Sequence, residues 1–242
     1  MDLRSSDTDR AREFYGQLFG WTAHTTGPEF NDYVNFTLDG DLVAGLVAND
    51  PANDQPDAWT TYLTASHAGA TARAIVAAGG QVPFGPHPVG EIGVLAAAID
   101  VAGAPFGLWQ DVTGSRAWAQ VRPGAASYHE LHTNRYDEVV AFYASVFGRE
   151  PKTVGDTDEF RYTQLLADDG TPVAGIMDFS SWSPDLAEWF CYFGSADVDA
   201  TVERVEELGG AVLEPAQDTP YGRLAKVADP TGAVFKLTSL PG

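Results

Sequence analysis

The chain has 242 residues, of which 44% are hydrophobic and 12% aromatic, enough for one large or two small domains with buried cores. Its formal net charge of −20 at pH 7 repels phosphate backbones and anionic lipid surfaces. The composition therefore argues against disorder, and the charge predicts neither a nucleic-acid partner nor a membrane partner.

The chain carries no signal for export or membrane insertion. It has no apolar window of about 18 residues, and its first residues, MDLRSSDTDRAREFY, lack the apolar stretch of a secretory signal. The single cysteine, Cys191, lies in the apolar run EWFCYF, so we expect it to pack in a core. These features predict a cytoplasmic protein.

The first half of the chain alternates strand and helix patterns. An opening strand, MDLRS, precedes a helix that begins among the acidic residues Asp7 and Asp9 and ends at Gly20. A hairpin that turns at Gly40 follows, and then a strand, WTTYLTA. A second helix at 68–78 and two strands, GVLAAAID and PFGLWQ, complete this half.

The second half has the same order of elements. A strand, SYHELHT, leads into a helix that begins near Asn134 and ends at Gly148. A hairpin with its turn at Gly170 and a strand, WFCYFGS, come next. A helix at 198–208 and the strands RLAKVAD and VFKLTSL end the chain.

The two halves are an internal repeat. AREFYGQLFGW returns as VVAFYASVFGR, VAGL as VAGI, and DVAGAPFGLWQ as DPTGAVFKLTS, always in the same order. We therefore predict two homologous modules, residues 1–113 and 126–242, joined by a linker at 114–125 that contains chain-breaking Gly and Pro residues.

The repeated words resemble the vicinal-oxygen-chelate superfamily, which contains glyoxalase I, bleomycin-resistance proteins and extradiol dioxygenases. The first strands, Asp2-Leu3-Arg4-Ser5 and Glu130-Leu131-His132-Thr133, look like those of a two-module actinobacterial branch. The resemblance implies an α+β fold of two tandem βαβββ modules, which pair about a pseudo-twofold axis and leave concave clefts. Such a fold hosts many unrelated functions.

Metal-dependent members of that superfamily bind a divalent ion with His, Glu and Gln side chains at three strand positions. The repeat aligns these positions with Tyr128, with Thr60 and Phe190, and with Gly107 and Lys236. None of these residues is a usual ligand, and a lysine cation opposes a divalent ion. We therefore expect no metal and no other cofactor.

The stretch SYHELHTN is the densest set of acid-base groups in the chain. Alternation along a strand places Tyr128, Glu130 and His132 on one face and His129 on the other. A Glu–His pair in an apolar cleft can move a proton, so we predict that Glu130 and His132 are catalytic. The alternatives are a metal shared with a third ligand, a hydrogen bond that orients a ligand, or a bond between Glu130 and its equivalent, Asp2, across the pseudo-twofold interface.

A concave sheet that carries several tryptophans and tyrosines can stack on a flat, apolar ligand. Core packing is the alternative for the tryptophans, and a surface ion pair is the alternative for Arg223. The predicted ligand-binding residues are Asp2, Trp59, Trp109, Tyr128, Tyr162, Gln164, Trp189, Tyr192, Tyr221 and Arg223. Because most of the polar candidates lie in the second module, we expect one functional site there.

Three functions are consistent with these residues. The first is a cofactor-independent isomerase, cyclase or lyase that transfers a proton on an apolar, aromatic or polyketide-like metabolite. The second is a protein that binds and sequesters such a compound without turnover. The third is a metal-dependent lyase or dioxygenase with displaced ligands. Pairing of the modules within one chain is compatible with a monomer and with a dimer.

Overall fold

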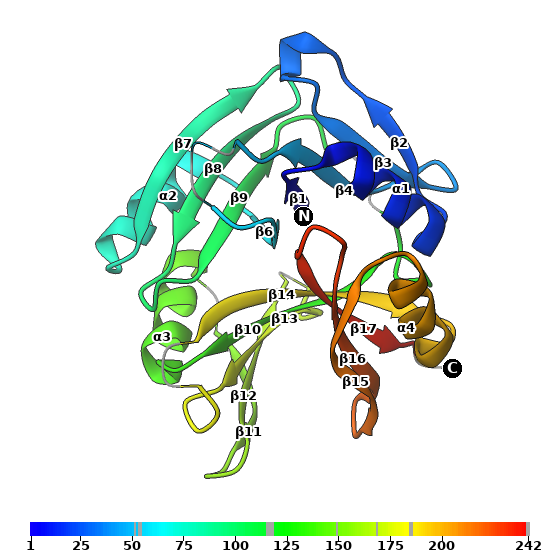
Figure 1. Cartoon of the computed structure of the whole chain (residues 1–242). Coiled ribbons are helices and arrows are strands. Elements are labelled where there is room, and N and C mark those ends of the chain that lie inside the picture. Colours follow the sequence, from blue (N-terminus) through cyan, green and yellow to red (C-terminus); the bar gives the residue numbers. More distant parts are fainter. Residues whose placement is uncertain are drawn as a thin grey trace. The chain divides into compact units, whose positions relative to one another are not determined.

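The computed structural model describes residues 1–50, 52, 55–114, 119–148, 150–167, 169–183 and 186–240, and it is a strand-rich α+β protein with four α-helices in this described part (Figure 1). The chain divides into two compact units. Unit 1 contains Met1–Thr60, Ala117–Tyr128 and Cys191–Gly242, and unit 2 contains Thr61–Arg116 and His129–Phe190. Each unit therefore combines half of the first repeat with half of the second. Residues 115–118 of the predicted linker lie outside the described residues.

Unit 1 contains a five-stranded sheet in the order β2-β3-β4-β1-β5 and a second set of strands in the order β14-β17-β16-β15. From the first repeat it takes β1 (Asp2–Ser5), α1 (Thr8–Phe19), β2 (Thr22–Thr25), the 3-10 helix η1 (Pro28–Phe30), β3 (Val34–Leu38), β4 (Asp41–Ala48) and β5 (Ala58–Thr60). From the second repeat it takes the end of β14 (Ala187–Ser195), α4 (Val198–Glu207), β15 (Ala211–Thr219), β16 (Gly222–Ala228) and β17 (Val234–Ser239).

Unit 2 contains strands in the order β6-β9-β8-β7 and strands in the order β11-β12-β13-β10. Its first-repeat elements are β6 (Tyr62–Thr64), α2 (Ala68–Ala77), β7 (Gln81–Val89), β8 (Gly93–Ile99) and β9 (Pro105–Asp111). Its second-repeat elements are most of β10 (Ala126–Thr133), α3 (Tyr136–Phe147), β11 (Lys152–Asp156), β12 (Arg161–Leu166), β13 (Pro172–Asp178) and the start of β14.

Four strands that the sequence did not predict, namely β2, β7, β11 and β15, lie at the edges of these sheets. Their residues are mostly exposed, so they lack the apolar alternation by which a strand is recognised. β7 also contains Pro83, Pro86 and Pro88, which only an edge strand tolerates. With these strands added, each repeat contains two βαβββ motifs within the described residues.

The helices begin and end where the sequence indicated. Asp7 and Asp197 accept hydrogen bonds from the backbone N–H groups of the first turns of α1 and α4. Gly20 and Gly148 end α1 and α3 in the left-handed conformation that favours glycine. In the part of the chain that the structure describes, no helix is both long and apolar enough to cross a membrane.

Each unit has its own core, to which the helices and alternate strand residues contribute. In unit 1 the strand residues Phe235 and Leu237 are fully buried in this core, and in unit 2 Leu131 and Ile176 take the same role. Because side chains alternate along a strand, the intervening positions project from the opposite face of each sheet. The candidate functional groups occupy these intervening positions.

A hydrogen-bonded triad lies in the core of unit 1. The indole N–H of Trp59 donates to the Tyr15 hydroxyl over 3.0 Å, and that hydroxyl donates to Asp229 Oδ2 over 3.0 Å. Asp229 Oδ1 accepts two backbone N–H groups of its own turn. Burial raises the pKa of Tyr15 well above its usual value, so the hydroxyl stays protonated and can donate.

Unit 2 repeats this triad with the equivalent residues. Trp189 Nε1 donates to the Tyr143 hydroxyl over 3.1 Å, and that hydroxyl donates to Asp100 Oδ2 over 3.2 Å. Burial also raises the pKa of Asp100. In both units the tyrosine and the aspartate come from different repeats, so the triad joins the two halves of the unit.

We expect Tyr143→Phe to destabilise the protein by about 1–3 kcal/mol, because it leaves the buried indole of Trp189 and the carboxylate of Asp100 without a shared partner. Urea unfolding at neutral pH measures this change. Tyr221→Phe is the control, because Tyr221 is 64% exposed. A loss in Tyr143→Phe no greater than in the control would contradict the role of the triad.

Candidate functional site

Glu130 and His132 lie on β10 in unit 2, on the face opposite the helix-covered core that contains Leu131. The side chain of Glu130 is 12% exposed and that of His132 is 5% exposed. Glu130 Oε1 and His132 Nε2 are 2.6 Å apart. A carboxylate and an imidazole therefore form a buried, charge-assisted pair on this face.

Tyr162 completes this arrangement from β12. Its hydroxyl donates to Glu130 Oε2 over 2.9 Å, so both carboxylate oxygens have partners. Strand β13 lies between β10 and β12. Its Gly175 is the cross-strand neighbour of Glu130 on β10 and of Gln164 on β12. A glycine at this position leaves no side chain between the carboxylate and β12, and Tyr162 can reach across.

Aromatic rings enclose the imidazole of His132. Phe179 stacks on it with ring centroids 4.3 Å apart, and Phe190 is tilted against it at 4.8 Å. Trp182 contacts Phe179 at 4.9 Å and is itself 60% exposed. A row of rings thus runs from the surface to the buried Glu130–His132 pair.

Unit 1 contains a related but different arrangement on β1. The Tyr33 hydroxyl donates to Asp2 Oδ1 over 2.8 Å, as Tyr162 donates to Glu130. Gly45 pairs with Asp2, and a Cβ at Gly45 would overlap both the Tyr33 hydroxyl and the Asp2 carboxylate. Arg4 occupies the position of His132 and donates to the Pro56 carbonyl. The Asp2 site therefore lacks the imidazole.

Sequence reasoning missed Tyr33, Phe179, Trp182 and Phe190. The repeat aligns Tyr33 with Tyr162, since both precede the matched VAGL and VAGI strands, and this alignment was a usable signal. Trp182 follows β13 in a segment with no periodic pattern, so the sequence offered no signal for it.

The structure distributes the other predicted ligand-binding residues over several environments. Trp59 and Trp189 lie in the two cores, on the helix-covered faces, and not on the opposite faces where we expected them. Trp109 is half-buried on β9, where its ring fills the space beside Gly93. Gln164 shares a face with Tyr162.

Two predicted residues lie at the surface of unit 1. Tyr221 is exposed at the turn between β15 and β16. Arg223 Nε contacts Asp199 Oδ2 at 2.6 Å, and its Nη1 contacts Asp218 Oδ1 at 3.0 Å. Arg223 thus forms the surface ion pair that the sequence left open as an alternative.

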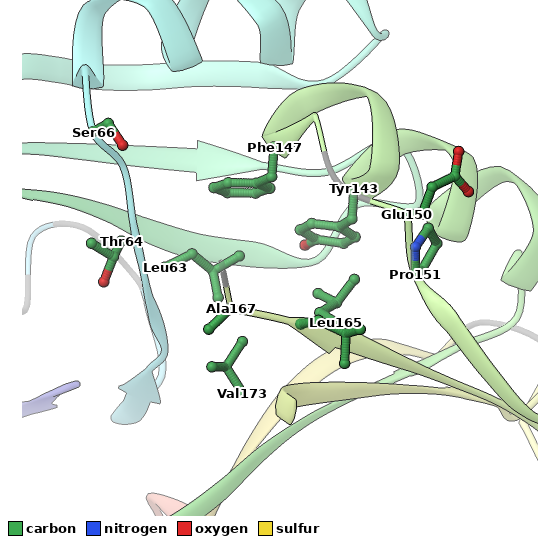
Figure 2. Close-up of a pocket in the computed structure, with 11 residues that line it drawn as sticks. Leu63, Thr64, Ser66, Tyr143, Phe147, Glu150, Pro151, Leu165, Ala167 and Val173 are labelled. Carbon is green, nitrogen blue, oxygen red and sulfur yellow. The ribbon is translucent and has the colours of Figure 1, made fainter. Parts of the chain in front are cut away.

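A separate cavity of about 300 Å³ lies in unit 2 at the end of α3 (Figure 2). Tyr143 and Phe147 project into it from α3, facing Leu165 and Val173 of the β12–β13 hairpin. Its other lining residues are Leu63, Thr64, Ser66, Glu150, Pro151, Leu166 and Ala167. None of the predicted site residues lines this cavity. The cavity lies on the helix-covered side of β12, to which Leu165 belongs, whereas Tyr162 and Gln164 project from the opposite side.

The positions that align with the superfamily's metal ligands do not fit a divalent ion. On β17 the position is Lys236, whose Nζ donates to the Tyr192 hydroxyl over 2.9 Å. On β9 it is Gly107, against which the ring of Tyr62 packs. Within the described residues no group of three His, Cys, Asp or Glu side chains is arranged to hold a metal.

His129 points to the other side of β10, and its Nδ1 lies 3.1 Å from Thr61 Oγ1. Burial lowers the pKa of His129 from 6.5 to about 3. The imidazole is therefore neutral in the folded protein at pH 5, whereas the unfolded chain binds a proton there.

Because only the unfolded state is protonated at this position, the stability contribution of His129 falls as the pH drops below about 6.5. Between pH 7 and pH 5 we expect the free energy of unfolding of the parent protein to fall by up to about 2 kcal/mol more than that of His129→Gln. Urea unfolding at the two pH values measures this difference. Equal losses in the two proteins would show that His129 keeps an ordinary pKa.

The comparisons with known proteins agree with the fold. Residues 126–237 match the Glyoxalase/Bleomycin resistance protein/Dioxygenase superfamily. The chain is 34% identical to the "Anthracycline biosynthesis protein DnrV" of Streptomyces peucetius, over 99% of this chain and 91% of that one. It is 31% identical to CFP32 of Mycobacterium tuberculosis (strain CDC 1551 / Oshkosh), whose name suggests a glyoxylase, over 98% and 92% of the two chains.

Among solved structures, the Mn(II)-bound glyoxalase from Novosphingobium aromaticivorans superposes with a TM-score of 0.68 at 18% identity, covering 98% of this chain and 80% of that one. At that identity the likeness concerns the fold alone. The curated relatives extend over almost the whole chain and include both repeats. This protein belongs to the Glyoxalase/Bleomycin resistance protein/Dioxygenase superfamily.

Proposed function

We propose that this protein acts on a flat, polycyclic aromatic polyketide and that Glu130 and His132 transfer a proton on it. The observation that carries the proposal is the 2.6 Å contact between these two side chains on a buried face walled by aromatic rings. The names of two Streptomyces relatives, which refer to anthracycline biosynthesis, support a ligand of this chemical class.

The proposed chemistry needs only a proton and a base. The carboxylate of Glu130 removes a proton from a carbon next to a ketone of the ligand, and an enolate and a carboxylic acid form. The acid then returns the proton to another carbon of the same conjugated system, or the enolate closes a ring or expels a leaving group. No electrons are gained or lost, so the step requires no oxidant or reductant.

His132 and Tyr162 hold the carboxylate of Glu130 in place. The Tyr162 hydroxyl donates to Glu130 Oε2 over 2.9 Å. The imidazole of His132 can share the proton of the acid across the same short contact. Phe179 stacks on the ring of His132 and fixes its plane. The carboxylate thereby keeps one orientation toward a bound ligand.

The proposal assigns no step to a metal. Lys236 and Gly107 occupy positions where metal-dependent members of the superfamily have ligands; an ammonium group does not coordinate a divalent ion, and glycine has no side chain to do so. The Glu130–His132 pair has no third ligand of the types His, Cys, Asp or Glu arranged around it in the described residues. Proton transfer by side chains uses the groups that the chain contains.

A second function, binding without turnover, is favoured by a specific feature. Both oxygens of Glu130 already have hydrogen-bond partners within the protein, so the carboxylate is satisfied without a ligand. In that case the exposed indole of Trp182 and the rings behind it would form a surface for sequestering a polycyclic compound.

Glu130→Gln separates these two functions. We expect the parent protein in D2O to exchange deuterium into the carbon next to a ketone of an anthracycline-type polyketide, measured by mass spectrometry. Deuterium exchange should be about 10²–10⁴-fold slower in Glu130→Gln than in the parent, because the base is absent. The variant should keep its affinity for the compound in fluorescence titrations.

Asp2→Asn is the matched control, since it makes the same chemical change at the equivalent position of unit 1. This control should exchange deuterium at nearly the rate of the parent. Exchange that persists in Glu130→Gln would contradict the assigned role of Glu130. A parent protein that binds the compound but exchanges no deuterium would indicate sequestration.

Trp182→Ala tests the entrance to the site. Removing an exposed ring that contacts Phe179 should weaken binding of a polycyclic ligand by about fivefold, because an aromatic contact of this kind contributes on the order of 1 kcal/mol. The free energy of unfolding should change little, since the indole is 60% exposed. Titration by intrinsic fluorescence and urea unfolding measure the two quantities. Unchanged affinity would remove Trp182 from the site.

A further inference from the structure

Two of the three lysines of the chain face each other in unit 1. Lys226 of β16 and Lys236 of β17 are direct cross-strand partners in an antiparallel pair. Like charges placed opposite each other in this way repel, so the arrangement is unfavourable by itself. Lys226 is partly neutralised by Glu214, whose Oε1 lies 3.5 Å from its Nζ.

Lys236 lies against the ring of Tyr192. Its Nζ donates to the Tyr192 hydroxyl over 2.9 Å and lies 5.0 Å from the centre of the same ring. Tyr128 meets Tyr192 edge to face with ring centroids 6.5 Å apart. These three residues, which we call the Lys236 cluster, lie on the face opposite the core, since their neighbours Phe235 and Phe193 are core residues.

Unit 2 has the same backbone arrangement without the charges. The strand pair that corresponds to Lys226 and Lys236 carries Ala97 and Gly107. Tyr62 takes the place of Tyr192, and its ring fills the space that a side chain at Gly107 would need. The cations of unit 1 are therefore not required by the fold, because the same register is built in unit 2 from small residues.

We propose that the Lys236 cluster is a second ligand site, which binds an aromatic organic anion through a carboxylate or an ionised phenol. The ammonium of Lys236 supplies a fixed positive charge at the register where metal-dependent members of the superfamily have a ligand to a divalent cation. An ammonium donates hydrogen bonds to a single anionic oxygen, and the tyrosine rings offer aromatic contacts to the ring that carries it.

The net charge of the whole protein favours the Lys236 cluster over other parts of the surface as an anion site. A net charge of −20 repels anions from most of the surface, so an anion gains affinity only where cations are concentrated. Tyr128 of the Lys236 cluster lies on the same face of β10 as Glu130, two residues before it, whereas Lys236 itself belongs to β17 of unit 1. The anion site and the proposed proton transfer are therefore tested by different variants, Lys236→Met for the first and Glu130→Gln for the second.

The test compares 1-hydroxy-2-naphthoate with its uncharged analogue, 1-hydroxy-2-naphthamide, by isothermal titration calorimetry. We expect the parent protein to bind the acid about tenfold or more tightly than the amide, because a charge-assisted hydrogen bond is formed only with the acid. Lys236→Met should abolish this preference. Lys152→Met, which removes an exposed lysine of unit 2, and Glu130→Gln should retain it.

A parent protein that binds neither probe, or binds both equally, would overturn the proposal, as would a preference that survives in Lys236→Met. Reductive ¹³C-methylation of the parent provides a measurement that does not depend on a variant. The chain has only three lysines, so three side-chain resonances are expected in addition to that of the amino terminus. Addition of the acid should shift the Lys236 resonance and leave that of Lys152 unchanged.

Discussion

A hydrogen bond between a helix tyrosine and a turn aspartate joins the two halves of each unit. Tyr15 reaches Asp229 in unit 1, and Tyr143 reaches Asp100 in unit 2, each with an indole donating to the same hydroxyl. A carboxylate oxygen left without a partner in such a core would be costly, so the bond favours the combination of halves from different repeats. When the two halves of a unit combine in this way, the sheet faces that carry the functional groups take up their positions.

Glycines on the inner strands decide which side chains meet on that face. Gly45 lies between Asp2 and β3, and Gly175 lies between Glu130 and β12, so a tyrosine can reach the carboxylate in both units. Gly107 has the opposite effect, since the ring of Tyr62 occupies its space and excludes a functional side chain. The same backbone thus carries different chemistry in its two units.

The units have diverged mainly in charge. Unit 2 pairs a carboxylate with an imidazole at Glu130 and His132, whereas unit 1 has Asp2 and Arg4 at these positions. Unit 1 instead carries Lys226 and Lys236 where unit 2 has Ala97 and Gly107. A duplicated scaffold tolerates such differences because they lie on the face away from the cores, where side chains do not determine how the helices pack.

The sequence by itself determined the repeat, the α+β class, the helix ends and the shared face of Glu130 and His132, because periodicity and caps are local properties. It did not reveal the edge strands, which have no buried face to leave a pattern. Only the tertiary structure decided that Trp59 and Trp189 are core residues and that Tyr162 and Phe179 contact the Glu–His pair. These contacts join strands and segments distant in sequence, and their register follows from how the whole sheet pairs.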